Sequence, residues 1–220
     1  MPQPSLRDML FADEPLPEAA RHGAGESAGE PWTHFAAAQQ ATREGDPTTA
    51  VGELQKVLGT EGLESRVYLQ TWHCLRALGV SPPQETARRI QGVVVEVALD
   101  GGLDLVAAYA DHSARYLNHA GGGIIWEGDD AGINKVIDAL LAVGQGIVDQ
   151  IGLWDGARPP APPTGSVRIN MLTFGGLYFG QGEFEALAKD PMGGAAIGTA
   201  FALMQALIAK QTAAGSATAH

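Results

Sequence analysis

Apolar residues in the first half of the chain recur at intervals of three and four, which is the spacing of an amphipathic helix. This pattern predicts helices over residues 33–44, 48–58 and 65–78, with a fourth beginning after Ser81. Gly45-Asp46-Pro47 separates the first two helices, and Gly79 ends the third as a C-terminal cap. The sequence therefore predicts a helical region over residues 32–90.

The first two of these helices carry small and apolar residues at a recognisable spacing. The positions are Ala38, Ala41, Gly45, Asp46, Ala50, Leu54 and Val57. This set resembles one tetratricopeptide repeat, a family in which small residues let two antiparallel helices approach closely. The resemblance implies a repeat-like helical pair that binds protein or peptide. Because a stack of such repeats needs about three units to be stable, we expect a pair packed on another part of the fold.

The pattern changes after residue 90, where β-branched and aromatic residues form short runs bounded by turn residues. Asp100-Gly101-Gly102 fits a tight hairpin, because Asp and Gly tolerate positive φ. Further along, Gly175-Gly176 lies between two more such runs. We expect a four-stranded antiparallel meander over residues 92–99, 103–110, 114–119 and 123–128, and a second strand pair over 166–174 and 176–180.

Two long apolar segments alternate with these strands. Residues 130–152 show strong helical periodicity, and Gly144 falls on the apolar face, where a missing side chain allows close packing on a sheet. Residues 191–211 predict a helix that is apolar nearly all round, with a ridge of small residues every fourth position: Gly194, Gly198, Ala202 and Ala206. The ridge suits close approach of another helix. That helix comes either from the N-terminal region, which we favour because its helices need a surface to pack on, or from another copy in a homodimer.

The order of elements predicts an α+β fold in which N-terminal helical hairpins pack on an antiparallel sheet made of a meander, a helix, a strand pair and a helix. The element order of the second half is similar to that of profilin or roadblock proteins. We expect a flexible N-terminal segment over 1–31, a helical repeat-like region over 32–90, an α+β domain over 91–212 and a disordered tail over 213–220. The proline-rich stretch 158–165 is either a connector within the fold, which we favour, or a ligand for a partner.

Composition narrows the classes of partner. The formal net charge is −11, so the surface repels nucleic acid and anionic lipid and would suit a basic partner.

The single cysteine, Cys74, permits no intramolecular disulfide and fits a reducing compartment, and the N-terminal residues do not have the pattern of a secretory signal. Residues 191–209 carry no charge, but they are rich in Gly and Ala and so favour a buried helix over a membrane span. We therefore expect a cytoplasmic protein without nucleic-acid or membrane partners.

No motif of high specificity for catalysis, metal or cofactor binding occurs, so we expect no catalytic residues, no metal and no cofactor. Asp111-His112-Ser113 has the residue types of a nucleophilic triad, but neighbours in one turn do not form its linear relay. The acidic residues Asp129 and Asp130 precede a helix, where an N-terminal cap explains them better than a cation site.

The best candidates for a ligand-binding or partner-binding site are Tyr116, Asn118, Trp126 and Glu127, in the third and fourth predicted strands. Alternate residues of a strand share a face, so Tyr116, Asn118 and Trp126 could line one surface. The competing interpretation is that the two aromatic rings pack in the core and Asn118 closes a turn. We therefore expect a non-enzymatic protein-interaction or adaptor protein that binds another protein. The alternative is a small-molecule-binding or enzymatic α+β domain that uses the strand face around Tyr116 and Trp126.

Overall fold

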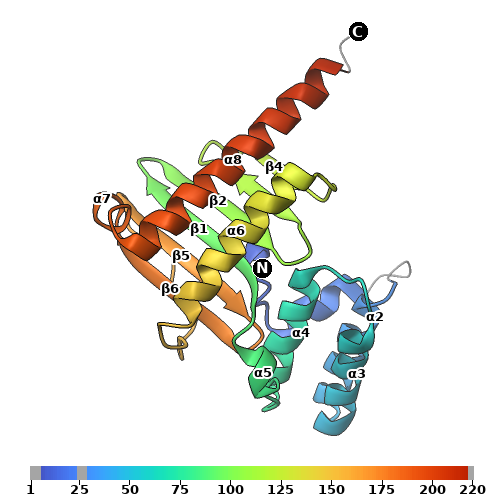
Figure 1. Cartoon of the computed structure of the whole chain (residues 1–220). Coiled ribbons are helices and arrows are strands. Elements are labelled where there is room, and N and C mark those ends of the chain that lie inside the picture. Colours follow the sequence, from blue (N-terminus) through green and yellow to red (C-terminus); the bar gives the residue numbers. More distant parts are fainter. Residues whose placement is uncertain (1–5, 24–28, 218–220) are drawn as a thin grey trace. The chain divides into compact units, whose positions relative to one another are not determined.

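The protein is described by a computed structural model that covers residues 6–23 and 29–217 (Figure 1). The chain divides into two compact units, Met1–Ala87 and Arg88–His220. The first unit is helical, and the second holds a six-stranded antiparallel sheet with helices. The predicted α+β class is therefore confirmed.

Three longer helices form most of the N-terminal unit, close to the positions that the apolar spacing predicts. They are α2 (Trp32–Arg43), α3 (Pro47–Gly59) and α4 (Ser65–Ala77), followed by the short α5 (Gln84–Ala87). The Asp46 side chain caps α3 by accepting a hydrogen bond from the Thr49 backbone at 3.0 Å, and Pro47 occupies the first helical position. Gly45 and Gly79 adopt positive φ at the ends of α2 and α4, a conformation that glycine permits without strain.

The helices of this unit enclose a core of small and large apolar residues. Ala38 and Ala50 are fully buried, as are Phe35, Leu54 and Val57. The helices α2 and α3 pack against each other, and Ala38 and Ala50 contribute short side chains to their shared core.

The N-terminal segment differs from the expectation of a flexible stretch over 1–31. Residues 6–23 contain three short helices, η1 (Asp8–Leu10), α1 (Leu16–Ala19) and η2 (Ala20–Gly23). Leu16 and Ala19 belong to the same core as α2 and α3, and Gln70 exchanges two hydrogen bonds with the Glu14 backbone, at 2.7 and 3.1 Å. The average composition of residues 1–31 does not predict this packing, because two or three apolar residues are enough to anchor a short segment. Residues 1–5 and 24–28 of the predicted segment lie outside the described residues.

The C-terminal unit is built on one sheet with strand order β4-β3-β2-β1-β5-β6, in which all neighbours are antiparallel. The strands are β1 (Ile90–Leu99), β2 (Gly102–Tyr109), β3 (Ala114–Leu117), β4 (Gly123–Trp126), β5 (Ser166–Thr173) and β6 (Gly176–Glu183). The predicted meander of four strands and the later strand pair are both confirmed. The last pair joins the sheet beside β1, so β1 and β5 are neighbours inside the sheet although 66 residues separate the end of one from the start of the other.

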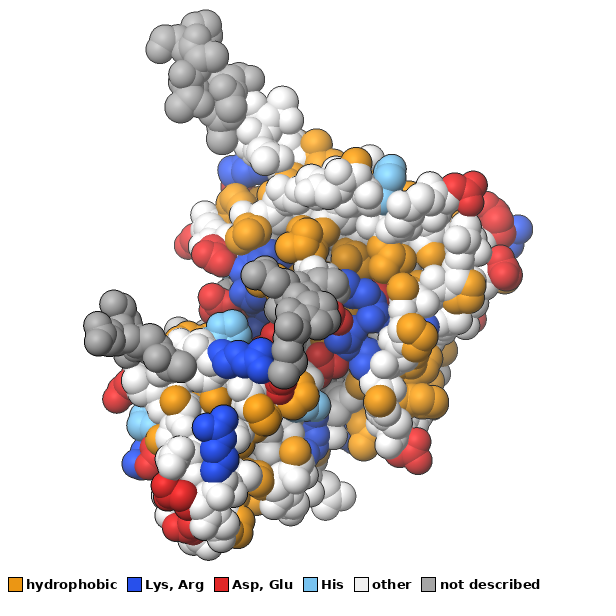
Figure 2. Space-filling view, turned by 180° about the vertical axis from the view of Figure 1, so that it is seen from behind, with side chains coloured by type: hydrophobic (Ala, Val, Ile, Leu, Met, Phe, Trp, Pro, Cys, Tyr) orange, Lys and Arg blue, Asp and Glu red, His pale blue; other side chains and the backbone are white. Residues whose placement is uncertain are grey.

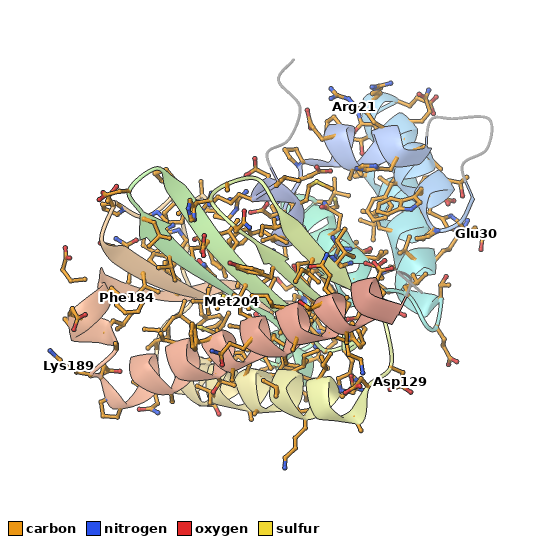
Figure 3. All side chains as sticks on the ribbon, turned by 90° about the horizontal axis from the view of Figure 1, so that it is seen from above. Arg21, Glu30, Asp129, Phe184, Lys189 and Met204 are labelled. Atoms are coloured by element: carbon orange, nitrogen blue, oxygen red, sulfur yellow. The ribbon has the colours of Figure 1, made fainter. Side chains whose placement is uncertain are left out.

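Two long helices, α6 (Ala131–Val148) and α8 (Pro191–Ala217), cover one face of this sheet, and the short α7 (Phe184–Leu187) precedes α8 (Figure 1). They lie side by side (Figure 3), and they run antiparallel, because Asp130 at the start of α6 pairs with Lys210 late in α8. The core between helices and sheet is formed by one face of each element. Its members include Val93, Val95, Val106, Ile137, Leu140, Met171, Leu203 and Leu207.

Gly144 marks the closest approach of α6 to the sheet. A Cβ atom at this position would lie 2.6 Å from Ile90 Cδ1 and 2.7 Å from Val93 Cγ2, and such distances are too short for real contacts. The placement of Gly144 at a helix–sheet contact is therefore confirmed.

The helix α8 is longer than its sequence pattern predicts. It continues to Ala217 rather than ending near Gln211, and Figure 1 shows its last turns extending past the sheet. The extra residues include several alanines, the residue type with the highest helix propensity. Residues 218–220 of the predicted tail lie outside the described residues.

Candidate functional site

Tyr116 and Trp126, two of the four predicted site residues, lie on the side of the sheet that faces the helices. In the strand register Trp126 is opposite Ala114 and Tyr116 is opposite Ile124, and both rings are half-buried against the core beneath α6 and α8. The Tyr116 hydroxyl donates to Asp104 Oδ2 at 3.2 Å. Burial raises the pKa of Tyr116, and the negative charge of Asp104 adds to that effect. These two aromatic residues therefore pack in the fold as the competing interpretation describes.

The other two residues point elsewhere. β3 ends at Leu117, and the Asn118 side chain closes the following turn by accepting from the backbone N–H groups of Ala120 and Gly122, at 3.1 and 2.8 Å. Glu127 accepts from Arg115 at 2.7 Å, and Arg115 belongs to the opposite face of the sheet. The four predicted residues therefore do not share one surface.

The opposite face of the sheet holds a buried polar group that the sequence analysis missed. Arg168 and Asn170 on β5 and Glu96 on β1 are each at most 3% exposed. Arg168 Nη1 lies 3.5 Å from Glu96 Oε2, and Asn170 Nδ2 donates to the same carboxylate oxygen at 3.0 Å. The available signal was the alternation Val-Arg-Ile-Asn-Met in β5, which places Arg168 and Asn170 on one face.

This group holds the proline-rich connector against the sheet. Arg168 donates to the Pro160 carbonyl at 2.7 Å and to Gln181 Oε1 at 2.8 Å, and its guanidinium lies 5.4 Å from the centre of the Phe179 ring. Before this connector begins, the Trp154 ring meets Phe179 edge-on at 5.1 Å. Since the backbone of residues 158–165 is tied down in this way, the stretch is a connector within the C-terminal unit.

The remaining residue types suited to chemistry have structural partners. Asp111 Oδ1 accepts from both the hydroxyl and the backbone N–H of Ser113, whereas His112 Nε2 lies 2.9 Å from Asp138 on α6, so the three residues form no relay. Burial raises the pKa of Cys74 to about 11, which keeps this thiol protonated at neutral pH.

The acidic residues before α6 act as a helix cap. Asp130 Oδ1 accepts from the N–H groups of Gly132 and Ile133, and its other oxygen pairs with Lys210. Within residues 6–23 and 29–217, no group of three or more His, Cys, Asp and Glu side chains is arranged to hold a metal ion.

A small cavity of about 250 Å³ lies within the N-terminal unit. Its lining includes Met9, Trp32, Val67 and His22, whose ring lies 5.0 Å from the Trp32 ring. The volume is below the range of roughly 300–1,000 Å³ that is usual for ligand pockets. The cavity is therefore a weaker candidate for a functional site than the outward surface of α8.

The outward surface of α8 carries apolar residues that the described part of the C-terminal unit leaves exposed. We use the name α8 seam for five exposed residues spaced by three and four positions: Gly198, Phe201, Gln205, Ile208 and Thr212. Phe201 is 54% exposed and Ile208 is 40% exposed. A Cβ atom at Gly198 would meet no described atom within 4 Å, so the ridge of small residues is open here.

The α8 seam also lacks charge. The sequence from Pro191 to Ala209 has no Asp, Glu, Lys or Arg, and the small residues Ala195, Ala202 and Ala209 beside the seam are exposed. By contrast, the surface in Figure 2 shows charged side chains of both signs among hydrophobic ones. Exposed apolar strips of this kind are common where one molecule contacts another.

By length and composition, α8 and α6 are each apolar enough to cross a membrane. Of the apolar window in α8 only 28% is buried, against 39% in α6. Core helices of soluble proteins meet the same criterion, so this observation is weak by itself.

No protein-family model, no curated protein and no solved structure matches this chain.

Proposed function

We propose that this chain is a non-enzymatic protein-interaction or adaptor protein, and that the α8 seam is its contact surface. The observation that carries the proposal is the exposure of Phe201 and Ile208 on an uncharged helical strip. Burial of a side chain of this size contributes about 1.5–3 kcal/mol. A partner that covers both residues would therefore gain a substantial part of its binding free energy at this one strip.

The support of the helix makes the strip a suitable binding surface. The inward side of α8 is anchored in the core by Ala196, Ala200, Leu203 and Leu207, so the exposed residues sit on a rigid element. Little ordering entropy is lost when a rigid surface binds. The resemblance of the α2–α3 pair to a tetratricopeptide repeat supports the same class of function.

The alternative, a small-molecule-binding or enzymatic domain around Tyr116 and Trp126, has less support. These two rings pack against the core, whereas Asn118 closes a turn and Glu127 pairs with Arg115. The net charge of −11 supports a protein partner over nucleic acid, and the single buried cysteine supports a cytoplasmic location.

The test is an affinity capture from the source cell with three forms of the chain, followed by mass spectrometry of the retained proteins. We expect Phe201→Glu to lose the proteins that the wild type retains, because the substitution places a charge in the apolar seam. Ile125→Glu is the matched control, since Ile125 on β4 is 69% exposed and receives the same charge. Equal retention by wild type and Phe201→Glu would refute the proposed function.

A further inference from the structure

We propose that the occupant of the α8 seam is a second copy of this chain, with the two α8 helices packed antiparallel about a two-fold axis. This inference rests on the proposed function, because it names the partner of the same surface. Three features of the seam support it.

The first feature is the spacing of the exposed residues. Gly198, Phe201, Gln205, Ile208 and Thr212 follow intervals of three, four, three and four, which is the heptad spacing of a helix that packs along another helix. All five positions are exposed, so the seam is not used for packing within the C-terminal unit. A partner helix with the same spacing fits it, and α8 of a second copy has that spacing.

The second feature is the order of large and small residues along the seam. In an antiparallel pair centred near Leu203, Phe201 lies opposite Gln205 of the second copy, and Ile208 lies opposite Gly198 of the second copy. Each large apolar side chain then lies opposite a residue that is smaller or polar and carries no charge. A parallel pair would instead place Gly198 against its own copy and leave a gap, which close-packed interfaces avoid. The seam is therefore self-complementary in one orientation, as a two-fold interface requires.

The third feature is charge. Each chain carries a net charge of −11, so two copies repel each other over most of their surfaces. The repulsion is weakest where the surface has no ionised side chain, and the stretch from Pro191 to Ala209 is such a place. A strongly basic or acidic partner would find no ion pair on the seam. The small residues Ala195, Ala202 and Ala209 beside it also allow two helices to approach closely.

Sedimentation velocity over a wide range of concentration tests whether the pair forms. We expect the wild-type chain to dimerise and Phe201→Glu to raise the dimer dissociation constant by roughly 100-fold or more, because the change occurs twice in a two-fold interface. Ile125→Glu should leave the dissociation constant unchanged. Far-ultraviolet circular dichroism and thermal melting verify that the variants are folded, and Ile208→Glu serves as a second seam variant.

Cysteine cross-linking tests the orientation. In the antiparallel pair Ala195 lies close to Ala209 of the second copy, so a mixture of Ala195→Cys and Ala209→Cys chains should form a mixed disulfide dimer. Neither variant should cross-link to itself. The wild-type chain is the control for Cys74, which is 1% exposed. Cross-linking of each variant with its own copy would overturn the antiparallel arrangement.

A wild-type chain that stays monomeric at all concentrations overturns the inference. If Phe201→Glu then loses the captured proteins that the wild type retains, the proposed function stands with a different partner; if it retains them, both fail. Flotation with phosphatidylcholine vesicles gives a further outcome. Binding of a monomeric wild type to these vesicles, reduced by Phe201→Glu, would assign the seam to a lipid surface and also overturn the inference.

Discussion

The helices α6 and α8 cover the same face of one sheet, but their outward surfaces differ. α6 is amphipathic, with Ile137 and Leu140 buried and Lys135, Asp138 and Asp149 exposed. On α8 the inward residues are equally apolar, whereas the outward surface holds Phe201, Ile208 and uncharged small residues. A single chain needs only one apolar side on each helix. The outward side of α6 therefore exposes charged residues to solvent, whereas the outward side of α8 exposes uncharged and apolar ones, which is the basis of the interaction proposed for α8.

The largest effect should come from the inward side of α8. We expect Leu203→Ala to lower the free energy of unfolding by about 2–5 kcal/mol, because Leu203 is fully buried and the change leaves a cavity. Chemical denaturation monitored by circular dichroism measures it. A decrease in the free energy of unfolding of less than about 0.5 kcal/mol would contradict the burial of Leu203 between α8 and the sheet.

A smaller effect should come from the contact of α6 with the sheet. We expect Gly144→Leu to cost about 1–3 kcal/mol of unfolding free energy, because the new side chain would overlap Ile90 and Val93. Gly146→Leu is the matched control on the same helix: Gly146 is exposed and has no described atom within 4 Å of its Cβ position. This control should be neutral or stabilising by up to about 1 kcal/mol, since leucine favours helix more than glycine does. Equal effects of the two changes would contradict the placement of α6.

The outward side of α8 should tolerate a large residue. We expect Ala202→Phe to change the free energy of unfolding by no more than about 0.5 kcal/mol at concentrations where the chain is monomeric, because Ala202 is exposed. Thermal and chemical denaturation of the monomer measure this change. Loss of folding in a strictly monomeric protein would instead show that the ridge is packed within the chain.

The smallest effect concerns the pairing of α8 with the start of α6. The hydrogen bond from Lys210 lowers the pKa of Asp130, and the Ile133 N–H lowers it further. Because the folded-state pKa is lower than the unfolded one, this stabilisation is present above the ordinary value of 3.8 and is lost as the pH falls through the folded-state pKa. Asp130→Asn should therefore reduce the acid dependence of the melting temperature. An identical dependence below pH 4 in the variant and the wild type would contradict the role of this pair.

The sequence by itself predicted the three longer N-terminal helices, the six strands and the two long helices of the C-terminal unit, in the order in which they occur. Apolar residues at intervals of three and four identified most of the helices, because one side of such a helix must be buried. Runs of β-branched residues between turn residues identified the strands. Local chemistry was enough at Asp130, because a helix cap depends only on neighbouring residues. Gly144 was also predictable, since its position on the apolar face follows from the period of the helix alone.

The tertiary structure decided which side chains meet across long distances in the sequence. It separated Tyr116 and Trp126 from Asn118 and Glu127, because β3 and β4 end before the predicted strands do. It brought Arg168 to Glu96 through the pairing of β5 with β1, which no local pattern specifies. It also decided which side of α8 faces the sheet. The sequence of a helix that is apolar nearly all round has no periodic pattern that shows its orientation. Only packing against the sheet therefore determined that Phe201 and Ile208 point outward.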